Sequence, residues 1–133
     1  MRKHRVDAGP DTVHWGFFDA GLNPLITIDP GDEVTISTVS GPPEAMPKAE
    51  SGLAVPPALS AIHAKVQQRL GPHIMTGPIA VRGAKAGQVL EVRIKSIALH
   101  LTGATTSSAR SPARCPTILP RRVSFIFRSI ARG

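Results

Sequence analysis

Hydrophobic and polar residues alternate in the first half of the chain in a way that predicts β-strands. Residues 24–29 form an apolar, β-branched run, and residues 33–39 continue with alternating polarity. A Pro-Gly-Asp sequence at residues 30–32 separates the two segments and is typical of a tight turn. We therefore expect two strands joined by a short turn.

A second pair of strands is predicted at residues 78–82 and 88–97, on either side of a glycine-containing turn. In the later segment Glu91, Arg93 and Lys95 fall on one face, because successive side chains of a strand point to opposite sides. We expect that polar face to lie in water and the apolar face to be buried.

One helix is predicted, at residues 58–70. Its apolar residues recur at spacings of three and four, and the Gly-Pro sequence at residues 71–72 is a stop signal. The preceding residues 41–57 contain five prolines, so we expect a long surface loop there. The predicted fold class is mainly β, either β-sandwich-like or a mixed β domain, with one short helix. The stripe of the helix consists of Leu59, Ile62, Val66 and Leu70.

Composition supports this prediction and divides the chain into three regions. The 133 residues allow one domain, and 13 prolines and 12 glycines suit short strands joined by turns. We distinguish a basic leader at residues 1–9, a body at residues 10–97 and a tail at residues 98–133.

The single Cys115 excludes an internal disulfide bond. The sequence shows neither a signal segment nor an apolar run of the roughly 20 residues that would cross a membrane, so we expect a cytoplasmic protein without membrane contact.

The net charge of +7 comes almost entirely from the tail. Residues 1–100 carry ten basic and nine acidic residues, a net of +1, whereas residues 101–133 carry six arginines and no acid. A basic nucleic-acid-binding module is therefore an alternative function, because cationic surfaces neutralise phosphates. Interleaved aromatic residues are missing from the body, and we expect no nucleic-acid partner. The six arginines of the tail are Arg110, Arg114, Arg121, Arg122, Arg128 and Arg132.

The tail also lacks periodicity between residues 102 and 120, and only residues 123–130 regain a short β-like alternation. Its Ala, Arg, Pro and Ser content is what an out-of-frame reading of GC-rich coding sequence tends to give. We hypothesise a frameshift near residues 97–101 and expect the tail to be unrelated to the body and poorly ordered. Re-sequencing the gene tests this, since an intact frame with no alternative continuation would contradict it.

Two ordered blocks in the body carry a family resemblance. The first is HWGFFD at residues 14–19, followed by the strand and Gly-Asp turn at residues 24–34. The second is GPHIMTGPIAVRGAKAGQVLEV at residues 71–92. Both closely resemble the opening of acetamidase/formamidase-family proteins, in which an HxGxxD segment precedes a strand and an H-x-x-TGP segment follows. The chain departs from that pattern at Gly21, at Gln88 and everywhere after residue 97, so we expect a domain incomplete at its C-terminus.

The resemblance implies hydrolysis of the C–N bond of small linear amides, such as formamide or acetamide, to ammonia and a carboxylate. On this basis His14 and Asp19 are the first candidate catalytic residues, with His73 and Thr76 on a loop that could reach them. Activation of water leaves two mechanisms open: direct acid–base catalysis, or a divalent metal such as zinc, with His14 and Asp19 as its ligands. Purely structural roles are the alternative, in which these residues hydrogen-bond locally or shape turns.

The later segments of the family are absent from this chain, so we expect an inactive fragment of an amidase. A third alternative is a non-catalytic β-rich interaction domain that joins a partner, or a second copy, through its unpaired strand edges. Such edges favour self-association, and we include a homo-oligomer among the expected partners beside the small amide substrate.

Overall fold

The computed structural model describes residues 1–47, 50, 52–99 and 120–130, and it is built mainly of strands in mixed sheets with one α-helix. The predicted fold class is thus confirmed. Within the described residues no helix is long and apolar enough to cross a membrane. In chain order the elements are β1 (Lys3–Val6), β2 (Val13–Trp15), β3 (Ile26–Ile28), β4 (Glu33–Ser37), a 3₁₀ turn η1 (Pro43–Ala45), α1 (Pro57–Lys65), β5 (Ile74–Thr76), β6 (Ile79–Val81), β7 (Val89–Leu99) and β8 (Pro120–Ile130).

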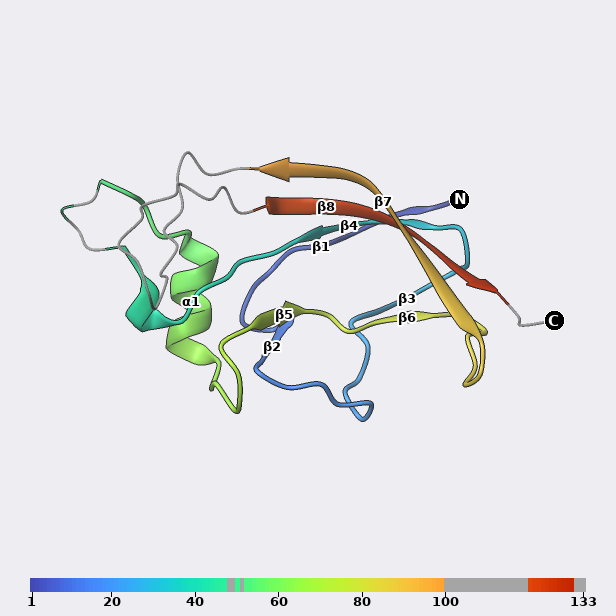
Figure 1. The fold of residues 1–133 in the computed structure, drawn as a ribbon, viewed down its shortest axis with the longest axis horizontal. Helices are drawn as coiled ribbons and strands as arrows, with labels where there is room; N and C mark the ends of the chain where they lie inside the picture. The colour runs from blue at the N-terminus through green and yellow to red at the C-terminus, as the bar shows by residue number, and fades with distance from the viewer. Residues whose placement is uncertain (48–49, 51, 100–119, 131–133) are drawn as a thin grey trace, which may run out of the picture.

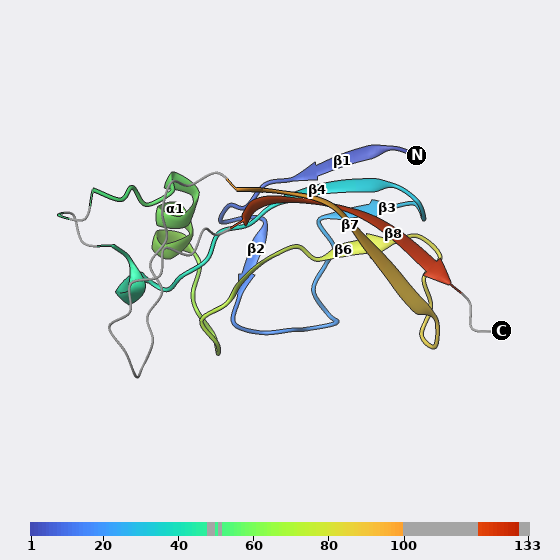
Figure 2. The same ribbon diagram turned by 45° about the horizontal axis from the view of Figure 1, so that its top comes forward.

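The strands form one four-stranded sheet and two strand pairs. The central sheet has the order β1-β4-β8-β7, in which β1 runs parallel to β4 while β8 runs antiparallel to both β4 and β7. The strand β2 pairs with β5 antiparallel, and β3 pairs with β6 parallel. Figures 1 and 2 show α1 at one end of the molecule, beyond β2 and β5, with the N-terminus near the other end.

The predicted tight turn is present, but the strands that it joins do not pair with each other. The amide of Asp32 donates a hydrogen bond to the carbonyl oxygen of Asp29 over 3.0 Å, which closes the turn. This turn carries the chain from β3, in a strand pair, to β4, in the central sheet. The β3–β6 pair packs on the central sheet over the buried residues Val6, Ile28 and Val34. That contact is the hydrophobic core of the strand layers.

The helix is shorter than the sequence predicted, because it ends at Lys65 rather than near residue 70. Val66 is already extended, and the chain then runs back toward β2, where the amide of Arg69 donates to the carbonyl oxygen of Trp15 over 3.2 Å. Only the first half of the predicted stripe is buried, since Ile62 is 0% exposed whereas Leu70 is 78% exposed. The backbone bonds available at β2 replace the last helical turn.

Residues from the predicted leader and tail contribute strands to the central sheet. The strand β1 lies within the basic leader and places Val6 in the core. The strand β8 lies in the tail, where the short alternation was noted, and the proposed boundary at residue 97 falls inside β7. Residues 100–119 and 131–133, on which the frameshift and disorder hypotheses depend, lie outside the described residues.

Candidate functional site

The two blocks that carry the family resemblance lie side by side in the structure. The strand β2 from the first block pairs with β5 from the second, with Val13 opposite Thr76 and His14 opposite Met75. The contact continues past the strands, because the amide of Gly16 donates to the carbonyl oxygen of His73 over 2.9 Å. Residues about 60 positions apart in the sequence therefore form one local unit.

An open hollow of about 580 Å³ lies beside this strand pair. Its walls combine three polar residues, His14, Asp19 and Thr76, with a mostly apolar remainder. Apolar walls with a few convergent polar groups are typical of small-molecule sites. The other lining residues are Phe18, Ala20, Leu22, Met75 and Pro78.

His14 is partly buried, and one of its ring nitrogens is held by the backbone. Its Nδ1 lies 3.3 Å from the carbonyl oxygen of Gly77. A carbonyl oxygen only accepts, so Nδ1 carries the hydrogen, and in the neutral ring Nε2 is left as an acceptor. The ring of Phe17 meets the His14 ring edge-on, with 5.4 Å between centroids, and helps to fix its orientation. His14 thus has the tautomer that a general base requires.

Asp19 is exposed at the rim of the hollow and also shapes its own turn. Its Oδ1 accepts a hydrogen bond from the amide of Gly21 over 2.7 Å. This is the Asx-type local bond that the structural alternative predicted for it. The second carboxylate oxygen, Oδ2, has no bond among those described, so the side chain still offers an anionic acceptor toward the hollow.

Thr76 and His73 differ in their relation to the hollow. The Thr76 hydroxyl donates its hydrogen to the carbonyl oxygen of Ser37 over 3.1 Å, which ties the end of β5 to the end of β4. In this arrangement the hydroxyl positions the strand, and its proton is not offered to a ligand. The side chain of His73 is exposed and does not line the hollow, although its backbone carbonyl pairs with Gly16.

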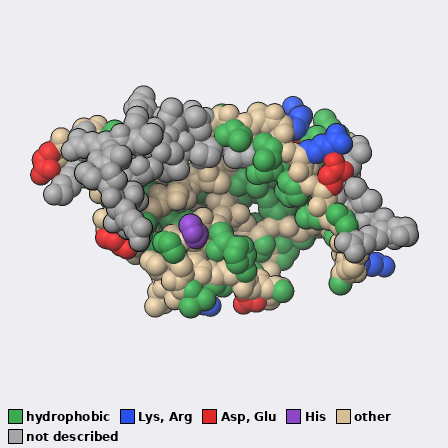
Figure 3. Space-filling view, viewed as in Figure 1, with side chains coloured by type: hydrophobic (Ala, Val, Ile, Leu, Met, Phe, Trp, Pro, Cys, Tyr) green, Lys and Arg blue, Asp and Glu red, His purple; other side chains and the backbone are tan. Residues whose placement is uncertain are grey.

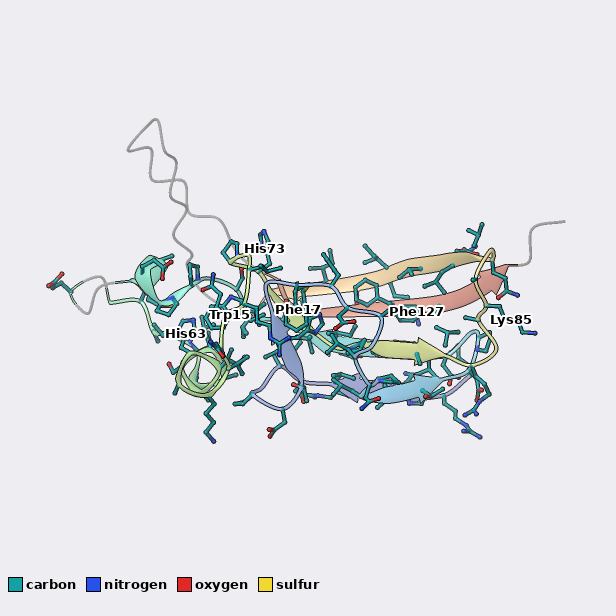
Figure 4. All side chains as sticks on the ribbon, turned by 90° about the horizontal axis from the view of Figure 1, so that it is seen from below. Trp15, Phe17, His63, His73, Lys85 and Phe127 are labelled. Carbon is teal, nitrogen blue, oxygen red and sulfur yellow. The ribbon has the colours of Figure 1, made fainter. Side chains whose placement is uncertain are left out.

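A pair of stacked rings, Trp15 of β2 and His63 of α1, supports the site and was not predicted from the sequence. Trp15 is 2% exposed, stacks on His63 of α1 with 5.5 Å between centroids, and donates its indole hydrogen to the carbonyl oxygen of Pro72 over 3.2 Å. His63 in turn hydrogen-bonds the carbonyl oxygen of Gly41 through Nε2 over 2.9 Å. Figure 4 shows Trp15 beside His63, next to α1. The pair of rings anchors β2 between α1 and the loop before β5.

The three aromatic residues of the first block differ in exposure. Aromatic residues such as Trp15, Phe17 and Phe18 are more often core residues than substrate walls. Trp15 is indeed buried, but Phe18 is 92% exposed and lines the hollow. The guanidinium of Arg69 lies over the ring of Phe17, 4.7 Å from its centroid, in a cation–π contact. A pattern of aromatic residues alone does not reveal which of them faces a site.

A complete metal site is not formed by the described residues. No group of three or more His, Cys, Asp and Glu side chains is placed there to hold an ion. His14 and Asp19 provide two donors, whereas a catalytic zinc site ordinarily takes three protein ligands. The residues in this part of the chain therefore do not fit a zinc centre by themselves, and no step is assigned to a metal.

The six arginine side chains behind the nucleic-acid alternative lie outside the part of the chain that the structure describes, so this alternative stays a prediction. Arg110, Arg114 and Arg132 lie outside the described residues. The other three belong to β8, without described side chains.

The fold is similar to that of a solved structure of a predicted acetamidase/formamidase. No protein-family model matches the chain, and no curated protein matches it in sequence. The crystal structure of a predicted acetamidase/formamidase from the thermophile Thermoanaerobacter tengcongensis superimposes with a TM-score of 0.53 at 27% sequence identity. The match covers 75% of this chain and 29% of that protein. The resemblance seen in the two sequence blocks is thus confirmed by the fold, and the chain corresponds to less than a third of the length of that protein.

Proposed function

We propose that this chain carries part of an active site that hydrolyses the C–N bond of small linear amides. The observation that carries the proposal is the pairing of β2 with β5, which puts His14 and Asp19 on one hollow, in a fold shared with a predicted acetamidase/formamidase. Formamide and acetamide are the substrates implied by the family resemblance, and the products are ammonia and the corresponding carboxylate.

His14 is the general base of the proposed reaction. With Nδ1 donating to Gly77, Nε2 accepts a proton from a water molecule as the water oxygen bonds to the amide carbon. The tetrahedral intermediate then collapses, the C–N bond breaks, and the protonated imidazole returns the proton to the leaving nitrogen. The imidazole is neutral before and after the cycle, so protons and electrons balance.

Asp19 and the apolar walls bind and orient the amide. The free Oδ2 of Asp19 accepts an N–H hydrogen of the substrate, which distinguishes an amide from an ester of the same size. Leu22, Met75 and Pro78 contact the acyl side, where formamide and acetamide differ by one methyl group. We place Thr76 as a positioning residue, because its hydroxyl is bound to Ser37.

We further propose that this chain alone hydrolyses amides slowly or below detection. It spans 29% of the related protein, and stabilisation of the oxyanion is not provided by the three polar residues of the hollow. Binding is therefore the more informative first measurement. An amide of four heavy atoms is expected to bind with a dissociation constant of about 1–100 mM.

The test is an NMR titration of the labelled protein with acetamide, with ammonia release measured on the same samples. We expect saturable shifts in the signals of His14 and Met75, and their loss in a His14→Gln variant. Acetate and ethyl acetate serve as ligand controls that lack the amide N–H. Signals that do not move, or move equally with all three ligands, would contradict an amide site.

A further inference from the structure

The strand β7 forms an open edge of the central sheet among the described strands, and it is much longer than the strand at the opposite edge. Among the described strands β7 has β8 on one side and none on the other. It is 11 residues long and contains no proline, whereas β1 at the far edge has 4 residues, among them Lys3 and Arg5. Proteins protect sheet edges by keeping them short, charged or interrupted. The edge at β1 is both short and charged. The edge at β7 is long, with Glu91, Arg93 and Lys95 on one face and two register irregularities, between Ile94 and Ser96 and between Ala98 and Leu99.

The apolar face of β7 is also uncovered. Register places Ile94 opposite Phe125 of β8, and Phe125 opposite Val34 of β4, so these side chains share one face of the sheet. Under the β3–β6 pair that face is closed, with Val34 0% exposed, while Ile94 at the edge is 61% exposed. Figure 3 shows hydrophobic side chains gathered across the middle of the molecule, and in Figure 4 β7 lies on the opposite side of the view from β3. The exposed side chains of this face are Leu90, Val92, Ile94 and Ile97.

We propose that β7 pairs antiparallel with β7 of a second copy of this chain, with Val92 on the two-fold axis. The pairing joins two central sheets into one of eight strands and satisfies the backbone groups of both edges. On the apolar face Val92 contacts its own symmetry mate, and Leu90 contacts Ile94 of the second copy. These cross-strand contacts cover part of the apolar surface that each copy exposes.

The charged face of β7 selects this register. In an antiparallel pair, residues directly opposite each other point to the same face of the sheet. A two-fold axis perpendicular to the sheet therefore passes between one residue and the same residue of the second copy. With Val92 on the axis, Glu91 lies opposite Arg93 of the second copy, and the reverse contact is equivalent. An axis at Glu91 would place that carboxylate against its own mate, and an axis at Arg93 would oppose two guanidinium groups. Only the register centred on Val92 is complementary in charge, and it uses the two residues that form an ion pair of 2.6 Å within each chain.

Charge reversal tests the contact by sedimentation equilibrium. We expect the unmodified chain to form dimers, and Glu91→Arg and Arg93→Glu each to raise the dissociation constant about tenfold or more, since each creates two like-charge contacts. The double variant restores opposite charges and should return the dissociation constant to within about threefold of the original. Arg5→Glu changes the net charge as Arg93→Glu does, but at the far edge of the sheet, and should leave the dimer intact. A monomer at every concentration, or single variants that dimerise like the parent, would overturn the proposal.

Disulfide trapping tests the register without depending on the folding of charge variants. In a Cys115→Ser background, Val92→Cys places two thiols across the axis at a Cα separation of about 4.5–5.5 Å, within disulfide range. Mild oxidation should give a covalent dimer, while Thr27→Cys on β3, also exposed, should give none. Equal cross-linking of both variants, or none at Val92→Cys, would count against the register.

Discussion

The backbone of Gly16 lies directly against that of Gly71. The amide of Gly71 donates a hydrogen bond to the carbonyl oxygen of Gly16 over 3.0 Å. A Cβ atom on Gly16 would come within 2.4 Å of the Gly71 carbonyl oxygen, and the φ angle of Gly16 is +86°. This contact joins the HxGxxD block to the block that begins at Gly71, and both features of Gly16 require glycine.

Gly16→Ala is therefore expected to be strongly destabilising. The new methyl group meets fixed backbone rather than a movable side chain, so β2 and the loop before β5 must separate. We expect a loss of about 3 kcal/mol or more in the free energy of unfolding. Urea unfolding followed by the fluorescence of the single Trp15, next to the contact, measures it.

Gly31→Ala is the matched control, because Gly31 also has a positive φ of +91° but nothing lies within 4 Å of the added methyl group. Only backbone strain remains, and the expected loss is about 1–2 kcal/mol. Equal losses for the two variants would mean that the Gly16–Gly71 contact does not constrain the fold.

The local sequence pattern did not predict which strands pair with each other. Alternation predicted the strands near residues 26–28 and 33–37 and the turn between them. It did not predict that β3 pairs with β6 and β4 with β8, because alternation reports which face is buried and not which strand lies alongside. Alternation also predicted a buried apolar face for β7, whereas Leu90, Val92, Ile94 and Ile97 are exposed.

Ile62→Ala tests where the helix contributes to the core. Ile62 is fully buried in α1, so we expect a loss of about 2–5 kcal/mol in the free energy of unfolding, measured by urea titration. Leu70 belongs to the same predicted stripe but lies beyond the helix and is 78% exposed. Leu70→Ala should change stability by less than about 0.5 kcal/mol. A large loss of stability in Leu70→Ala would favour the longer helix that the sequence predicted.

The candidate site was predictable only as far as its motifs extend. His14, Asp19 and Thr76 lie in the two blocks, and β-pairing brings them to one hollow. His73 lies in the same block, but its side chain is exposed and does not line the hollow, whereas its backbone carbonyl oxygen accepts a hydrogen bond from the amide of Gly16. The Trp15–His63 stacking depends on how α1 packs, and no local pattern encodes that contact.

The ionisation of the Asp32 side chain determines how the stability of the fold should depend on pH. Its carboxylate is buried and accepts hydrogen bonds from the amide of Arg2 over 2.7 Å and from Nε2 of His4 over 2.9 Å. The Arg2 amide, followed by His4, lowers the pKa of Asp32 from 3.8 to about 2. A carboxyl group whose pKa is lower in the folded state stabilises the fold above its unfolded pKa, and this contribution is lost as the pH falls from about 4 toward 2.

Unfolding experiments from pH 7 to pH 2 with Asp32→Asn check this sign. The variant should be less stable than the parent at pH 7, and the difference should shrink below about pH 4 as the parent carboxylate becomes protonated. Asp11→Asn, at an exposed carboxylate, serves as the control and should follow the parent curve. A difference between Asp32→Asn and the parent that stays constant to pH 2 would show that the charge of Asp32 is not what stabilises the turn.

Asp19 has two functions in the proposed site, and two substitutions separate them. Asp19→Asn keeps a side-chain oxygen for the Gly21 amide and removes the negative charge, whereas Asp19→Ala removes both. We expect Asp19→Asn to leave the free energy of unfolding within about 0.5 kcal/mol of the parent and to weaken acetamide binding about tenfold, because hydrogen bonds to charged groups are the stronger ones. Asp19→Ala should weaken binding similarly and also lose about 1 kcal/mol of stability with the turn bond. Acetamide titration by NMR and urea unfolding, on the same three proteins, measure the two effects independently. If Asp19→Asn binds acetamide as the parent does, the carboxylate serves the turn alone and His14 remains the only residue of the pair with a proposed role in hydrolysis.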